Sequence, residues 1–256
     1  MIIILKQLKS ALLELFPTAK LRVILISLVL IAAFISVSEL AVAKLFTQII
    51  LNEGEYSKNT LIIFIISFFL FFGMTRAGLF LQRMYRVNVF DKAFKTSTAE
   101  LSATKDNWRW SLAFELTNIL SIVTQMSVVL LFFLYFNAIF GLIDLIIIII
   151  ILQILGRLFG KQIVAQRSFV VAKKKKEPVS NFIRIGTRIK SGEIGILISG
   201  IAMIFLLGAL LFFSYQGEIN PANTIVLFFG LRMQNSSLSS LSTALMRFAR
   251  ARTHSE

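Results

Sequence analysis

Five ionisable side chains interrupt the long apolar stretches of this sequence: Glu39, Lys44, Arg76, Asp144 and Arg232. A charge in such surroundings costs several kcal/mol unless it pairs with an opposite charge or faces water. Counted at helical rise from the flanking polar turns, Glu39 and Arg232 lie at a similar depth and could form a pair. Lys44 and Asp144 lie closer to the same turns and could pair in the same way. One interpretation is therefore structural pairing between helices.

An anion-binding site is the second interpretation. Arg76 and Arg232 could bind a phosphate or carboxylate group through paired hydrogen bonds in a water-filled cavity. The segment after Arg232 is too polar to face lipid, since it holds Gln234, Asn235, Ser236, Ser237, Ser239, Ser240, Ser242 and Thr243. A dimer interface would explain the same hydroxyl-rich face. The candidate substrate-binding residues are Arg232, Arg76, Glu39, Gln234 and Asn235.

No residue pattern in the sequence is typical of a catalytic or metal site. The chain has no cysteine and a single histidine, His254 in the polar C-terminal tail. Gly156, Gly160 and Lys161 do not form a phosphate-binding Walker A loop, because their spacing is wrong and Gln162 stands where a hydroxyl is needed. We predict no catalytic residue, no metal and no cofactor in this chain.

Composition predicts a membrane protein. The hydrophobic fraction is 57%, the mean hydropathy is +0.81 and the formal net charge is +14. A soluble domain of this length needs more polar surface. An excess of Lys and Arg could indicate nucleic-acid binding, but basic loops on the cytoplasmic side of a membrane explain it better. We therefore expect no nucleic-acid partner.

The expected architecture is all-α, with six transmembrane helices. Residues 1–20 predict an N-terminal helix that lies in the membrane interface, with Lys6 and Lys9 among the lipid headgroups. Residues 21–256 predict a six-helix transmembrane domain with cytoplasmic helical excursions at about 82–110 and 157–192. The crossings are expected at residues 21–51, 60–81, 111–135, 141–155, 194–213 and 221–248.

Basic residues set the expected orientation. Of the 27 Lys and Arg residues, 23 lie in the N-terminal segment, the two long basic stretches and the tail, whereas the three opposite turns hold only Lys58. Both termini are therefore expected in the cytoplasm of a multi-pass protein of the bacterial inner (plasma) membrane. Lys173 to Lys176 could bind anionic lipids or an acidic partner, or serve only as an orientation signal.

Helix order and loop lengths resemble the transmembrane domain of ATP-binding-cassette (ABC) exporters. The turn from Gly217 to Ala222, followed by Thr224 to Arg232, is similar to the turn that opens the family's sixth helix. The basic stretch from Leu81 to Phe94 is similar to the arm that leads to its first coupling helix. The family's nucleotide-binding domain does not follow in this sequence, which fits either a separate ATPase subunit or a truncated form of a longer transporter.

The resemblance implies a membrane subunit of an exporter or flippase for an amphipathic or anionic substrate. ATP and Mg²⁺ would bind to a separate nucleotide-binding subunit, and the transmembrane subunits would form a homodimer or heterodimer. Coupling contacts would come from two turns and include Glu100, Lys105, Asp106, Glu177, Asn181 and Arg184. Two alternatives stay open: a non-transporting scaffold or assembly subunit, and an ion-coupled transporter that uses Glu39 or Asp144 as a proton carrier.

Overall fold

The computed structural model describes residues 1–51, 56–95, 103–177 and 179–255. Within these residues the chain forms seven α-helices and no strand, so the expected all-α class is confirmed. The helices are α1 (Ile2–Leu15), α2 (Ala19–Ile50), α3 (Lys58–Lys95), α4 (Ala103–Phe136), α5 (Ala138–Lys174), α6 (Asn181–Tyr215) and α7 (Pro221–Ser255).

Five of these helices, α2 to α6, are long and apolar enough to cross a membrane, and they indicate a membrane protein. The sequence predicted six crossings. Helix α7 has 35 residues and is as long as its neighbours, but it is less apolar and does not count among the five in the described part of the chain.

Polar residues in the connections fix where the helices begin. Asn137 is the single residue between α4 and α5, and its Oδ1 accepts a hydrogen bond of 2.8 Å from the Phe140 amide. Asn220 accepts one of 2.7 Å from the Asn223 amide at the start of α7. Such side chains satisfy amides that lack a partner in the first helical turn. Gly217 follows α6 with φ of +77°, a conformation that glycine adopts without strain.

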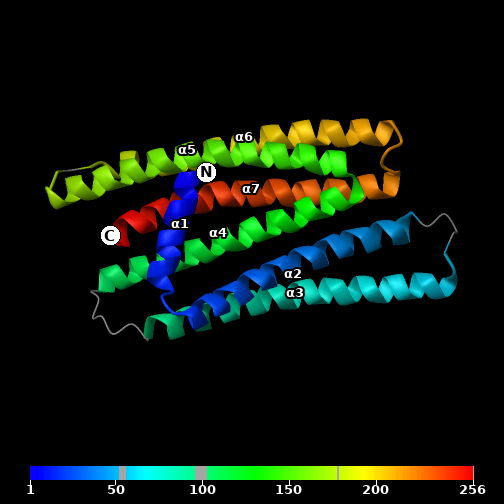
Figure 1. The fold of residues 1–256 in the computed structure, drawn as a ribbon, viewed down its shortest axis with the longest axis horizontal. Helices are drawn as coiled ribbons and strands as arrows, with labels where there is room; N and C mark the ends of the chain where they lie inside the picture. The colour runs from blue at the N-terminus through cyan, green and yellow to red at the C-terminus, as the bar shows by residue number, and fades with distance from the viewer. Residues whose placement is uncertain (52–55, 96–102, 178, 256) are drawn as a thin grey trace.

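The long helices run side by side, with α7 in the middle (Figure 1). Helix α7 packs on α4 and α6 above all, and also on α5 and α2. Helix α2 pairs with α3 and also contacts α4, whereas α3 packs chiefly on α2 and leaves most of its surface exposed. The polarity of α7 is compatible with its place, because protein rather than lipid covers most of it.

The bundle has two chemically different ends. The C-terminus, the end of α3, the start of α4 and the α5–α6 connection lie at one end, with the α1–α2 connection toward it, whereas the end of α2, the start of α3 and the connections α4–α5 and α6–α7 lie at the opposite end (Figure 1). We call the first the basic end, because it carries Lys173 to Lys176 where α5 ends, Arg184 and Arg188 near the start of α6, and Arg250 and Arg252 near the end of α7. The predicted excursions at 82–110 and 157–192 are thus mostly continuations of the long helices.

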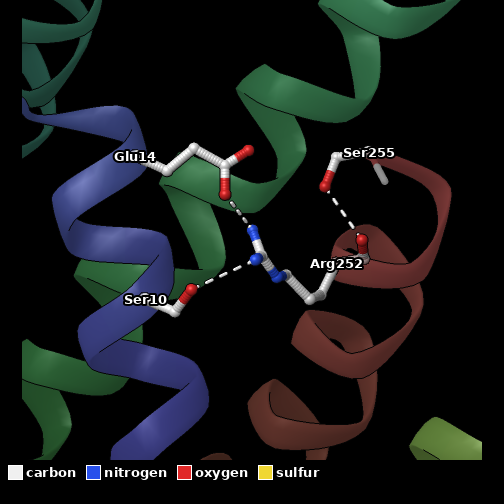
Figure 2. A network of polar contacts seen from close by, with 4 residues as sticks. All are labelled: Ser10, Glu14, Arg252 and Ser255. Carbon is white, nitrogen blue, oxygen red and sulfur yellow. Dashed lines mark hydrogen bonds and ion pairs between the residues drawn. The ribbon is translucent and has the colours of Figure 1, made fainter.

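Helix α1 lies across the long helices near the basic end (Figure 1). Its buried side chains, Ile4, Leu8, Ala11 and Leu15, face the bundle, whereas Lys6 and Lys9 are exposed. The guanidinium of Arg252 on α7 donates hydrogen bonds to Glu14 Oε2 and, at 3.3 Å, to Ser10 Oγ (Figure 2). The two ends of the chain are therefore joined by an ion pair.

Candidate functional site

A cavity of about 930 Å³ lies among α2, α3, α4 and α7. It brings together three of the five candidate substrate-binding residues: Glu39 from α2, Arg76 from α3 and Arg232 from α7. Glu39 is half-buried, and both arginines are exposed. The chain separates these residues by 37 and 156 positions, and only the packing of α2 against α3 and α7 unites them.

The two arginines have few contacts of their own. The Arg76 guanidinium lies 5.2 Å from the centre of the Phe72 ring, in a cation–π contact. Within the described residues, neither Arg76 nor Arg232 forms a hydrogen bond or an ion pair. The predicted pair of Glu39 with Arg232 is not formed, although both line the cavity, and Arg76 is the cation that acts electrostatically on Glu39. Two guanidinium groups are thus available to an anion.

Apolar side chains form much of the remaining wall. They include Ile35, Val42 and Phe46 of α2, Phe68 of α3 and Phe229 of α7. Ser236, Ser237 and Gln125 add hydroxyl and amide groups. An apolar cavity with a few convergent polar groups is typical of a site for a small molecule. The combination of two arginines with aromatic walls suits an amphipathic anion.

Gln234 and Asn235, the other two candidates, do not line this cavity. Gln234 is buried, and its Nε2 donates a hydrogen bond of 3.2 Å to Asp144 Oδ2 on α5. The Oδ1 atom of Asn235 is buried without a hydrogen-bond partner within the described residues. Both side chains lie on other faces of α7, so substrate contact through them would require a different arrangement.

The predicted pair of Lys44 and Asp144 is not formed. Asp144 is fully buried and accepts its hydrogen bond from Gln234. Lys44 instead lies over the Phe136 ring, with its Nζ 5.0 Å from the ring centre. The two residues also lie at different levels of the bundle, since Lys44 lines a cavity with Ala222 and Val226 near the start of α7, whereas Asp144 contacts Gln234 further along the same helix.

The candidate coupling residues lie at the basic end. Lys105 is exposed and Asp106 half-buried in the first turn of α4. Glu177 is exposed after α5, Asn181 is the first residue of α6, and Arg184 follows one turn later. Glu100 lies outside the described residues. The described members therefore gather at the end where a cytoplasmic partner is expected.

Sequence reasoning missed Gln125, which reaches the cavity from α4. It is a lone amide inside the apolar run from Ser121 to Tyr135, a signal of the same kind that identified Arg76. Phe72, which contacts Arg76, gives no such signal among the 25 phenylalanines of the chain.

Comparisons of the sequence with protein-family models and with curated proteins gave no match. The geometry of the cavity and the charges around it are therefore the basis for a functional conclusion.

Proposed function

We propose that this chain is the membrane subunit of an exporter or flippase that moves an amphipathic, anionic substrate. The cavity with Arg76 and Arg232 carries the proposal, because both guanidinium groups lie beside apolar walls and have no ionic partner among the described residues. Guanidinium groups bind phosphate and carboxylate in a bidentate geometry. The aromatic and aliphatic walls would hold the apolar part of the same molecule.

The energy source in this proposal is a separate ATPase subunit, as the resemblance to ABC exporters implies. Helix α7 would be the sixth crossing, since its 35 residues extend about 52 Å, which exceeds the thickness of a hydrocarbon core. The α3–α4 and α5–α6 connections at the basic end would face the ATPase in the bacterial cytoplasm, together with both termini. A homodimer or heterodimer of such chains would enclose the exposed side of the cavity.

Ligand binding tests the site. A fluorescent fatty acid with a free carboxylate should bind to the purified wild-type chain more tightly than its methyl ester. Arg76→Gln and Arg232→Gln should each weaken binding of the acid about tenfold, because a charge-assisted hydrogen bond is lost. Arg157→Gln, an exposed change on α5 outside the cavity, serves as the control. If the double variant binds the acid as the wild type does, the cavity is not the site.

Co-purification tests the partner. A nucleotide-binding ATPase should co-elute with the chain from native membranes. Charge reversal at Asp106 and Glu177 should abolish this, whereas Lys58→Glu at the opposite end should not. Absence of any ATPase would favour the scaffold alternative or ion coupling. Uptake driven by a pH gradient without nucleotide, lost in Asp144→Asn, would identify ion coupling, because Asp144 is a fully buried carboxyl on α5.

A further inference from the structure

One face of α7 runs along the whole helix. Ala222, Val226, Phe229, Met233, Ser236, Ser240, Thr243 and Arg247 follow each other in alternating steps of four and three residues. Residues at this spacing lie on one side of a helix. We call these eight residues the α7 stripe.

Three cavities follow the α7 stripe from one end of the bundle to the other. A cavity of about 240 Å³ at the opposite end is lined by Ala222 and Val226. The central cavity is lined by Phe229, Met233 and Ser236. A cavity of about 170 Å³ toward the basic end is lined by Thr243 and Arg247. Seven of the eight stripe residues therefore line a cavity, and the eighth, Ser240, is exposed between two of them.

Each cavity also contains a basic side chain that is not held in an ion pair within the described residues. These are Arg188 in the cavity toward the basic end, Arg76 and Arg232 in the centre, and Lys44 at the opposite end. Arg247 is different, because its Nε forms an ion pair of 2.8 Å with Glu115. Carboxylates accompany the cations in two places, Glu193 beside Arg188 and Glu39 in the centre.

The cavity around Lys44 is lined otherwise by neutral polar groups and a few apolar side chains. Thr47, Gln48, Tyr56 and Asn223 contribute hydroxyl and amide groups, and the described lining includes no carboxylate. A lone ammonium among hydrogen-bonding groups suits a phosphate or carboxylate. This cavity therefore has the chemistry of a second binding site for the same anionic group.

The packing along the α7 stripe differs on the two sides of the central cavity. Ser240, which lies along the stripe between the central cavity and the cavity at Thr243, is exposed. Toward Lys44, Val226 is buried and Gly230 packs closely against Phe133 of α4 and Leu40 of α2.

We propose that the α7 stripe is a conduction path for an anionic group, which passes from Arg188 to Arg76 and Arg232 and leaves past Lys44. This inference rests on the proposed function and adds to it the route and the release site. Lys44 attracts the anion after the packing at Gly230 opens, and the exposed loop side of this cavity is the release site.

The absence of cysteine in this chain allows a direct test without knowledge of the substrate. Single cysteines are introduced at Ala222, Ser236, Ser240 and Thr243, with Leu227→Cys and Ala244→Cys as buried controls on the same helix. Each variant reacts with an anionic and a cationic methanethiosulfonate of similar size. The ratio of the two rates is divided by the same ratio for a free thiol in solution.

The stripe cysteines should react faster than the buried controls, and the normalised ratio should favour the anionic reagent about tenfold. Arg232→Gln should lower the ratio at Ser236→Cys, and Lys44→Gln should lower it at Ala222→Cys while it leaves Thr243→Cys unchanged. A ratio near one, or one that does not respond to these changes, overturns the path. Such a result would not affect the ligand-binding test of the central cavity. Failure of the conduction path can therefore be distinguished from failure of the proposed function.

Discussion

At the scale of single residues, glycines decide how closely the helices approach. A Cβ atom added to Gly230 would lie 2.5 Å from Cε1 of Phe133, and one added to Gly195 would lie 2.7 Å from Cδ2 of Leu155. Small residues let membrane helices pack closely where lipid provides no hydrophobic drive. Gly156 is of the same kind, because it lies against the backbone of Met1 at the start of α1.

Gly230→Ala should therefore destabilise the chain. The methyl group has no space between α7 and α4, and overpacking of this kind costs about 1–3 kcal/mol. Gly208→Ala on α6 is the matched control, because nothing lies within 4 Å of an added Cβ and alanine favours the helix by up to about 1 kcal/mol. Thermal unfolding in detergent should show a lower midpoint for Gly230→Ala and an equal or higher one for Gly208→Ala. Equal midpoints for both would contradict the contact.

The same residue scale shows how much of the site the sequence could predict. Glu39, Arg76 and Arg232 were identifiable because charges are rare inside apolar runs, and all three line one cavity. Gln234 and Asn235 were grouped with them because the polar run after Arg232 is continuous. Within a helix only every third or fourth residue faces one way. Ser242 instead donates to the Gly192 carbonyl at 2.9 Å, so part of the polar run serves helix packing.

At the scale of helices, the packing of α7 explains why hydropathy selects five of the six long helices and leaves α7 out. Hydropathy measures affinity for lipid, whereas α7 is surrounded by α4, α5, α6 and α2. Its polar groups find protein partners, as Gln234 does with Asp144 and Ser239 does with Ser199 at 3.0 Å. The sequence predicted the position of α7 correctly from Pro221, but its central place depends on contacts with four other helices that no local pattern encodes.

The C-terminal turn of α7 is held by contacts at the basic end. The His254 ring lies 4.4 Å from the Trp108 ring of α4, and the Arg250 guanidinium lies 5.2 Å from the same indole. Burial lowers the pKa of His254 below its usual value, although the hydrogen bond to the Arg250 carbonyl opposes this change. The positive charges of Arg250, Arg184 and Lys173 also lower it. The folded chain therefore favours a neutral His254.

Acidification should loosen this contact. The pKa of His254 is lower in the folded than in the unfolded chain, so just below pH 6.5 the unfolded state binds more protons. Stability is complete above that pH and is lost as the pH falls through the folded-state value. The unfolding midpoint should decline between pH 7 and pH 5, and less steeply in His254→Asn. The fluorescence of Trp108, isolated by Trp110→Phe, should follow the same change. An equally steep decline in both proteins would show that other groups dominate.

At the scale of the whole molecule, charge and helix length together predict an orientation. Helix α5 extends about 55 Å with its 37 residues, which is longer than a hydrocarbon core of about 30 Å. In the predicted orientation, the excess length of α5 would extend from the membrane at the basic end, beside the similarly long α3 and α6. Cationic segments are retained on the cytoplasmic side. The basic end is therefore the expected docking side for a soluble partner, and the Lys44 cavity is expected to face away from the cytoplasm.

This orientation, with α7 as a sixth crossing, makes a prediction that separates it from a five-crossing arrangement. Three single cysteines report which side of the membrane each segment faces. Glu218→Cys lies at the opposite end, Lys175→Cys in the α5–α6 connection and Ser255→Cys at the end of α7. In intact cells a membrane-impermeant maleimide should label Glu218→Cys only, and in inside-out vesicles it should label the other two. Because α7 runs from one end of the bundle to the other between α4 and α6, Ser255 must share the side of Lys175. Labelling of Ser255→Cys together with Glu218→Cys in intact cells would contradict both the sixth crossing and the cytoplasmic C-terminus. The α7 stripe would then not span the membrane and could not conduct an anion across it.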